Sequence, residues 1–308
     1  MVARAAALRS KGLRRAPRDR SVPVPPLSPR AQLARAALIV VLVLSVSLLL
    51  QLLVVSGFQQ RAAQQSLFDR FRAELALGTA PTGPTDFEGQ VLALGAPVAY
   101  LEAPTIGLRQ VIVEGTSPSA LFDGPGHRRD TPLPGQEGVA VVMGRRASFG
   151  GPFSRIAELH EGDPIRVTAG QGTFDFEVMG VRGDGDPIPP LPEGGESRLM
   201  LATADGAPFV PDGVVRVDAA LTTEAVGGSS VLIGPGSLPA REDYMGSDTD
   251  TLYALVLWLE LLIALTAAAI WAWHRWSKAK AWVVFLPPLM LVGLFVSSEA
   301  ARLLPNLL

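Results

Sequence analysis

The sequence contains no cysteine and only three histidines. Disulfides, thiolate nucleophiles and thiolate metal sites are therefore excluded. The three histidines, His127, His160 and His274, lie far apart without metal-ligand spacing, so we expect no zinc site and no cofactor. Asp184 and Asp186 share one glycine-rich turn, which is more typical of a solvated loop than of a calcium site.

A surplus of positive charge is also missing. The 308 residues carry a formal net charge of −2, which gives no support for a nucleic-acid partner. The sequence has no P-loop, no Gly-x-Gly-x-x-Gly after an apolar run and no Gly-x-Ser-x-Gly elbow. Nucleotide-dependent enzymes and serine hydrolases of the common folds are therefore not indicated.

Long apolar runs, in contrast, are present. Residues 36–57, 252–273 and 281–297 are each long enough to cross the hydrocarbon core of a membrane as a helix. The first run is too long for a signal peptide and lacks a good cleavage site, so we predict an uncleaved anchor. Pro287 and Pro288 predict a kink in the last span, which leaves a re-entrant segment as an alternative there.

Basic residues flank these spans in a consistent pattern. Residues 1–35 form a basic tail, and Arg275, Lys278 and Lys280 lie between the last two spans. Because short basic segments stay in the cytoplasm, we expect a plasma-membrane protein with a cytoplasmic N-terminus and extracytoplasmic residues 58–250. Glu260 lies inside the second span; it is either functional or, as we favour, packed and hydrogen-bonded against another helix.

The segment outside the membrane begins with a helix and continues with β-structure. Residues 58–78 place Leu67, Phe68, Phe71 and Leu75 at helical spacing, which predicts an amphipathic stalk rather than a helix lying on the membrane. Residues 79–95 are rich in Gly, Pro and Thr and predict a linker, and residues 222–250 predict a polar tether.

Residues 96–221 have an all-β pattern, in which Gly, Pro and Asp clusters separate short β-prone runs. We predict short helices at 117–122 and 152–159. The fold class is therefore mainly β, a closed barrel with short helices, plus one N-terminal and two C-terminal transmembrane helices. The β-prone runs are Val98–Leu101, Val111–Val113, Val139–Met143, Ile165–Val167, Phe174–Val181, Leu199–Ala202 and Val214–Val217.

Short motifs occur in a fixed order along this β-region. They are Ala103–Leu108, Val113–Thr116, Gly124–His127, Thr131–Gly135, Gly144–Arg146, Phe149–Phe153, Gly162–Asp163 and Leu199–Ala204. Together they resemble the sortase family, especially the housekeeping-like, class E sortases of high-GC Gram-positive bacteria. The resemblance implies a sortase barrel and an acyl transfer in which a cysteine attacks a sorting-signal peptide, a histidine carries protons and an arginine holds the oxyanion.

The sequence departs from that family at the catalytic positions. Arg145 stands at the histidine position, Ala204 at the cysteine position, and Val214 at the arginine position, with Arg216 two residues further on the same strand face. A methyl group forms no acyl-enzyme, and a guanidinium does not shuttle protons at neutral pH. We therefore expect a degenerate member without sortase activity. Thr203 is a replacement nucleophile without a base, and His127 is expected to be structural.

Three functions follow from the resemblance. We favour a catalytically inactive interaction or scaffold module in cell-envelope assembly, whose protein partner is an active sortase or its substrate. The alternatives are a sensor that binds an anion or peptide in the degenerate groove, and a transpeptidase or hydrolase with altered chemistry. We expect Asp205 to pair with Arg145 and close the groove rather than leave Arg145 free for a ligand. The candidate groove residues are Met143, Arg145, Thr203, Ala204, Asp205 and Arg216.

Overall fold

The computed structural model describes residues 28–228, 231, 233–234, 236–276 and 278–308. Most of the predicted basic tail, residues 1–27, lies outside this range. The chain consists of two units, Met1–Leu42 and Val43–Leu308, and the barrel and the C-terminal helices belong to the second.

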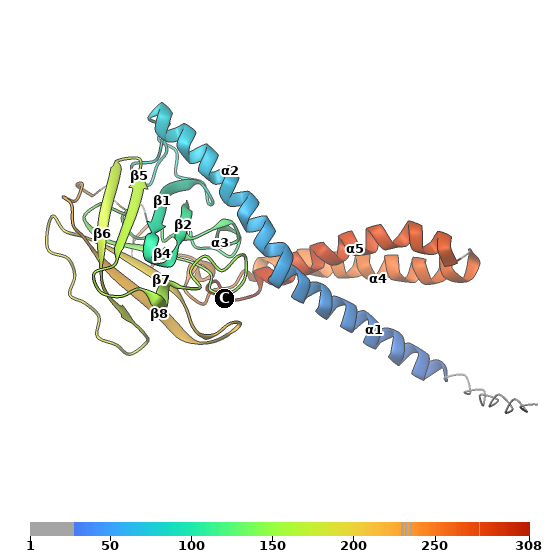
Figure 1. The fold of residues 1–308 in the computed structure, drawn as a ribbon. Helices are drawn as coiled ribbons and strands as arrows, with labels where there is room; N and C mark the ends of the chain where they lie inside the picture. The colour runs from blue at the N-terminus through green and yellow to red at the C-terminus, as the bar shows by residue number, and fades with distance from the viewer. Residues whose placement is uncertain (1–27, 229–230, 232, 235, 277) are drawn as a thin grey trace, which may run out of the picture. The chain divides into compact units, whose positions relative to one another are not determined.

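Eight strands close into a barrel in the order β1-β2-β3-β4-β7-β8-β6-β5, which confirms the predicted fold class (Figure 1). Alternate side chains of its strands fill the barrel interior, as period-2 alternation requires. The strands are β1 (Pro97–Ala103), β2 (Leu108–Glu114), β3 (Gly126–His127), β4 (Gly138–Met143), β5 (Pro164–Ala169), β6 (Gly172–Arg182), β7 (Ser197–Ala207) and β8 (Val210–Leu221). The predicted helix at 117–122 appears as α3 (Ala120–Asp123). The one predicted at 152–159 is wrong apart from a 3₁₀ turn, Ile156–Glu158.

Strand register determines which side chains share the outer face of β4, β7 and β8. Met143 of β4 lies beside Ala202 of the parallel strand β7. In the antiparallel pair of β7 and β8, Ala202 faces Arg216 and Ala204 faces Val214. Since side chains alternate along a strand, these five positions lie on one face, opposite the barrel interior.

Helix α2 lies along the barrel and is not a free stalk. It runs from Ser56 to Leu77, follows α1 (Pro29–Leu50) through a π-helical turn at Gln51–Val55, and ends at Gly78 in the left-handed conformation. Its Gln64 amide donates to the Val111 carbonyl over 3.1 Å and accepts from the Val111 N–H over 2.7 Å. Phe71 is buried and the Phe68 ring contacts Tyr100. The predicted apolar face therefore exists, but it packs on β1 and β2, where Gln64 completes the backbone hydrogen bonds of β2.

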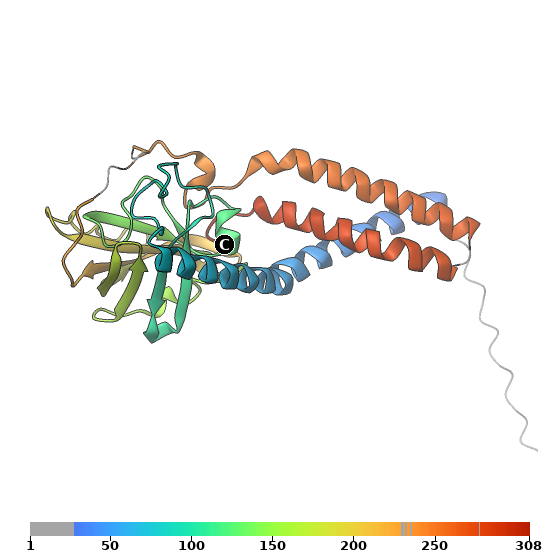
Figure 2. The same cartoon turned by 90° about the horizontal axis from the view of Figure 1, so that it is seen from above.

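Within the described residues, three helices are long and apolar enough to cross a membrane, as predicted: Val41–Leu77, Thr249–Trp273 and Lys280–Arg302. The last two overlap α4 (Leu252–Arg275) and α5 (Lys278–Arg302), which run side by side (Figure 2). Trp258 stacks on Phe295 across this hairpin, and α5 continues through its two prolines. Glu260 is exposed on α4 and has no hydrogen bond or ion pair among the described residues, so the packed Glu260 that we favoured is wrong.

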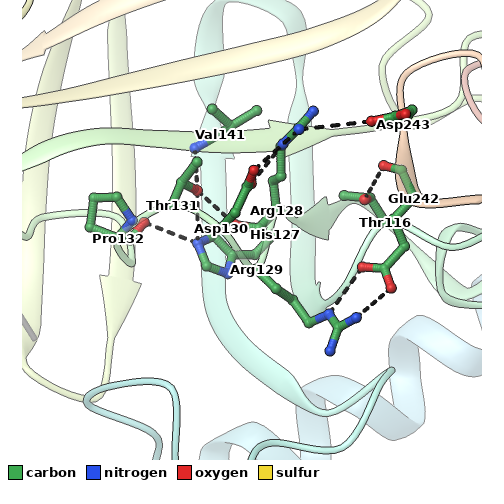
Figure 3. Close-up of polar contacts among 10 residues, drawn as sticks. All are labelled: Thr116, His127, Arg128, Arg129, Asp130, Thr131, Pro132, Val141, Glu242 and Asp243. Carbon is green, nitrogen blue, oxygen red and sulfur yellow. Dashed lines mark hydrogen bonds and ion pairs between the residues drawn. The ribbon is translucent and has the colours of Figure 1, made fainter. Parts of the chain in front are cut away.

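The second half of the predicted tether packs against the barrel. We call residues 239–248 the strap. Its Glu242 is completely buried and forms a two-pronged ion pair with Arg129, while Thr116 donates to the Glu242 carbonyl over 2.6 Å (Figure 3). Arg128 forms a hydrogen bond of 2.7 Å with Asp130 and lies 3.8 Å from the Asp243 carboxylate of the strap. Composition suggested a solvated linker, whereas these specific charge pairs hold the strap in place.

Candidate functional site

Positions 145 and 204 lie at the same end of the barrel. Arg145 follows β4 after Gly144, and Ala204 lies near the end of the neighbouring strand β7; both are completely buried. Gly144 N–H donates to the Ala202 carbonyl over 3.0 Å, and the Arg146 guanidinium donates to the Ala204 carbonyl over 2.9 Å. The parallel pairing of β4 and β7 thus brings positions 145 and 204 together.

Arg145 is a buried cation with incomplete hydrogen bonding. Its guanidinium carbon lies 4.9 Å from the ring centre of Phe122 and 5.2 Å from that of Phe149. Its Nη1 donates to Ser148 Oγ over 3.1 Å, whereas Nε and Nη2 have no hydrogen-bond partner in the described part of the chain. Burial lowers the pKa of Arg145 to about 9, so the group stays mainly charged at neutral pH. Phe149 has φ of 50°, a strained value for an aromatic residue, at the contact with Arg145.

The predicted pair of Arg145 with Asp205 is wrong. Asp205 accepts the Gly206 N–H over 2.8 Å, and within the described part of the chain it forms no ion pair with an arginine. Asp205 follows Ala204, so its side chain leaves β7 on the opposite face from the one that Ala204 occupies. The groove is closed by another part of the chain.

That part is the segment after α5, residues 303–308, which we call the tail. Leu307 and Leu308 join an apolar cluster that includes Met143, Ala204 and Val214. Exposure of Leu307 is 0% and that of Leu308 is 5%, so both side chains are inside the protein. The tail therefore covers the face on which Met143, Ala204 and Val214 lie.

Backbone hydrogen bonds fix the tail against the loop after β4. Arg146 N–H donates to the Leu307 carbonyl over 2.9 Å. The backbone oxygen of Leu308 accepts from Arg145 Nη1 over 3.4 Å, from the Ser148 N–H over 3.4 Å and from the Ser148 hydroxyl. Three positions of this loop, 145, 146 and 148, thus direct donors at Leu307 and Leu308.

The strap holds the tail from the other side. The Asn306 side-chain amide donates to the carbonyls of Arg241 and Asp243, over 2.7 Å each, and the Asn306 N–H donates to the Gly246 carbonyl over 2.9 Å. Tyr244 lies beneath two guanidinium groups, those of Arg128 and Arg216. Barrel, strap and tail therefore form one continuous network over β7 and β8.

Arg216 and Thr203 are engaged elsewhere. Arg216 lies on the predicted face, where it pairs with Asp184 over 2.8 Å and donates to the Val214 carbonyl. The hydrogen bond from Arg216 holds the pKa of Asp184 below its usual value. The Thr203 hydroxyl donates to the Gly144 carbonyl over 2.7 Å, and its side chain leaves β7 on the face opposite to that of Ala204. Among the described residues, no group of three His, Asp or Glu side chains is arranged to hold a metal.

His127 is completely committed to a structural contact. It pairs with Glu114 across β2 and β3, with Nδ1 3.0 Å from the carboxylate. Its Nε2 lies 2.9 Å from the Pro132 carbonyl (Figure 3). Both partners are acceptors, so the ring donates from both nitrogens as an imidazolium. Burial acts against this charge, but the Glu114 charge, its hydrogen bond and the Pro132 carbonyl outweigh burial and raise the pKa of His127.

Sequence reasoning missed Arg146, Ser148, the strap and the tail as parts of the site. One signal was available for the tail. The third predicted span ended at residue 297, yet four leucines, a proline and an asparagine follow Arg302. Apolar residues beyond the charged end of a span have to be buried somewhere, and the barrel is the neighbouring domain.

Comparison with known proteins agrees with this geometry. Residues 101–207 match the sortase domain family. The chain is 35% identical over 85 residues to Sortase D of Bacillus subtilis, a match that covers 28% of this chain and 41% of that relative.

Solved structures similar to this chain are also sortases. A Clostridium perfringens Sortase D5 transpeptidase is 19% identical with a TM-score of 0.44, covering 53% of this chain and 99% of that one. Sortase E from Streptomyces avermitilis is 25% identical with a TM-score of 0.37, covering 43% and 91%. Residues 101–207 of this chain therefore form a region similar to the sortase domain, within a closed barrel of the sortase type.

Proposed function

We propose that this sortase-family membrane protein acts by binding, as an interaction module of the cell envelope, and not by cysteine-dependent acyl transfer. One observation carries the proposal: the chain has no cysteine, and Ala204, which we align with the nucleophile position of the family, offers only a buried methyl group. The first chemical step of the family's reaction then has no attacking atom.

Proton transfer lacks a carrier as well. Arg145, with a pKa of about 9, remains mainly protonated at neutral pH and has no base to relay to. His127 uses both ring nitrogens in contacts to Glu114 and Pro132. Thr203 gives its proton to the Gly144 carbonyl, which is no general base. These contacts also argue against the transpeptidase or hydrolase of altered chemistry.

The interaction role rests on the intact barrel and on its covered face. In a sortase fold that face serves peptides, so the partners that we propose are an active sortase or the substrate of one. Extracytoplasmic placement of the barrel, with the N-terminus in the cytoplasm, remains part of this proposal and agrees with the basic loop between α4 and α5.

An assay with a sorting-signal peptide and an amine acceptor tests the lack of acyl transfer. We expect the purified full chain to give no ligated product above the background without protein, whereas an active sortase in the same detergent gives product readily. A Thr203→Ala variant is the control. Product that forms with the full chain and is lost in this variant would contradict the proposal and identify a threonine-based enzyme.

The sensor function has one observation in its favour, namely that Arg145 Nε and Nη2 are buried without partners. A small anion would complete their hydrogen bonding, but the tail blocks its entry. We therefore expect inorganic phosphate to leave the melting temperature of the full chain unchanged. It should raise the melting temperature of a chain that ends at Leu304, and fail to do so when that chain also carries Arg145→Gln. An upward shift in the full chain that depends on Arg145 would establish the sensor instead.

A further inference from the structure

The tail makes contacts that a bound peptide ligand would make. The Leu307 and Leu308 side chains, the backbone oxygens of these two residues and the Asn306 side-chain NH2 group have specific partners in the barrel, the loop after β4 or the strap. Asn306 Oδ1 is buried and has no hydrogen-bond partner among the described residues. A segment that only rests on a surface buries little and is poorly ordered. Here Asn306 and Leu307 are both completely buried.

From these contacts we infer that the face formed by β4, β7, β8 and the strap is a peptide-binding site whose resident ligand is the protein's own tail. The tail binds as a turn, because the Leu308 N–H donates to the Pro305 carbonyl over 3.1 Å. The ligand class is a short turn peptide with asparagine followed by two apolar residues. This inference rests on the proposed binding role. It adds the class of the ligand and the statement that the tail occupies the site in the full chain.

Recognition by the site divides into two parts. The apolar part is formed by Leu121, Met143, Ala202, Ala204 and Val214 around the two leucines. An alanine at 204 leaves an apolar wall where a thiolate would need a polar, cationic neighbourhood. The degenerate residue thus suits a site that holds an apolar ligand permanently.

The polar part of the site forms hydrogen bonds with the backbone of the tail and with the Asn306 side chain. The strap carbonyls of Arg241 and Asp243 accept from the Asn306 amide, so a residue without a side-chain donor leaves both carbonyls unsatisfied. Ser148 and Arg146 donate hydrogen bonds to backbone oxygens of the tail, which every residue has. Asparagine is therefore the specificity-determining position of the ligand.

Tethering explains why the site is closed in the full chain. The tail follows α5 directly, so its effective concentration at the site is in the millimolar range. A free peptide of the same sequence competes only at comparable concentration. Removing the tail, or drawing it away, frees the site for a peptide from elsewhere.

The absence of native cysteine allows a direct measurement of tail occupancy. In a full chain carrying Leu307→Cys, we expect a maleimide to react with the introduced thiol at least about a hundredfold more slowly than in the matched Leu191→Cys chain, because Leu191 is exposed in a loop. Millimolar peptide of residues 303–308 should accelerate the reaction at position 307 and leave that at 191 unchanged. Equal labelling rates at the two positions would overturn the inference.

Binding in trans is the second measurement. A chain that ends at Leu304 should bind a fluorescent peptide of residues 303–308 at least about tenfold more tightly than the full chain does, measured by anisotropy in detergent. A peptide with alanine in place of asparagine should bind more weakly, and a scrambled peptide of the same composition controls for partition into micelles. Equal binding of the native and scrambled peptides would overturn the inference.

The same truncated chain separates this inference from the proposed function. If it binds the peptide and also ligates it to an amine, the non-catalytic role fails and the peptide site stands. If it neither binds nor ligates, the peptide site fails and the non-catalytic role stands. The thiol-labelling measurement on the full chain decides the question should the truncated chain not fold.

Discussion

His127→Phe is expected to lower the free energy of unfolding of the barrel by about 3–5 kcal/mol, because it removes the ion-pair partner that contacts the buried Glu114 carboxylate directly. Glu114 is 4% exposed and cannot regain water without opening the sheet. The matched control is His160→Phe, since His160 is exposed and its hydrogen bonds with Asp163 are made by its backbone N–H and carbonyl. Denaturant unfolding followed by the circular dichroism of the sheet measures both variants. Tryptophan fluorescence is unsuitable, because all five tryptophans lie at 258–282 in the helical hairpin.

This ion pair also gives the wild-type barrel a defined pH dependence. The pKa of His127 is raised in the folded state, so its stabilising contribution is complete below the unfolded value of about 6.5. As pH rises, the unfolded chain loses its proton first, and the contribution declines until it is gone above the folded-state pKa. The difference in unfolding free energy between wild type and His127→Phe should shrink over this range. A difference that stays constant from pH 6 to pH 10 would show that the pair is not ionised as described.

A double variant separates the charge from the packing. Glu114→Leu combined with His127→Phe replaces the buried pair by apolar side chains, and such replacements are often close to neutral. We expect it to recover much of the stability lost in His127→Phe alone. The effects of the two substitutions on the free energy of unfolding should therefore be strongly non-additive. Additive losses would mean that the histidine contributes through its contact with Pro132 instead.

Arg129→Met is the second change with a large expected effect, and this effect is local. It leaves the completely buried Glu242 without its ion-pair partner. We expect this loss to lower the free energy of opening of the strap by about 3–5 kcal/mol. Amide hydrogen exchange of residues 239–248 measures the opening free energy directly. Exchange in β1 and β5, far from the strap, should stay at the wild-type rate.

The control for this variant lies on the strap itself. Arg241→Met removes an ion pair with Asp250 whose two side chains are 41% and 80% exposed, and such a pair contributes about 0–1 kcal/mol. Because Asn306 binds strap carbonyls, opening of the strap in Arg129→Met should also raise the exchange of the tail. If Arg129→Met and Arg241→Met changed the amide exchange of residues 239–248 equally, Glu242 would not be the residue that anchors the strap.

Local pattern was sufficient to predict much of the fold. Alternating or short apolar runs such as Val111–Val113 and Val139–Met143 fall inside β2 and β4, and the three apolar runs fall on helices. The two-residue strand β3 has no periodicity to detect, and its pairing is set by the contact between Glu114 and His127. Helix α2 carried the expected apolar face, but periodicity does not say what a face packs against.

The candidate site was predictable only as far as the family pattern extends. Positions 145 and 204 follow from aligned motifs, and parallel pairing of β4 and β7 brings them together. The contacts that close the site join residues about 60 to 160 positions apart, as Asn306 does with Arg241 and Leu308 with Arg145. Neither composition nor spacing encodes such contacts. For this reason the strap has the composition of a solvated linker although its Glu242 is buried.

Attachment at both ends of the α4–α5 hairpin has a consequence for membrane topology. The strap precedes α4 and the tail follows α5, and each is bound to the barrel. A hairpin that crosses a bilayer twice must then return to the leaflet from which it departed. Its turn around Trp276 belongs on the side of the bilayer away from the barrel, whichever compartment that side faces. This conclusion does not depend on the charges that flank the helices. A topology reporter fused at the turn therefore tests it independently of the charge pattern.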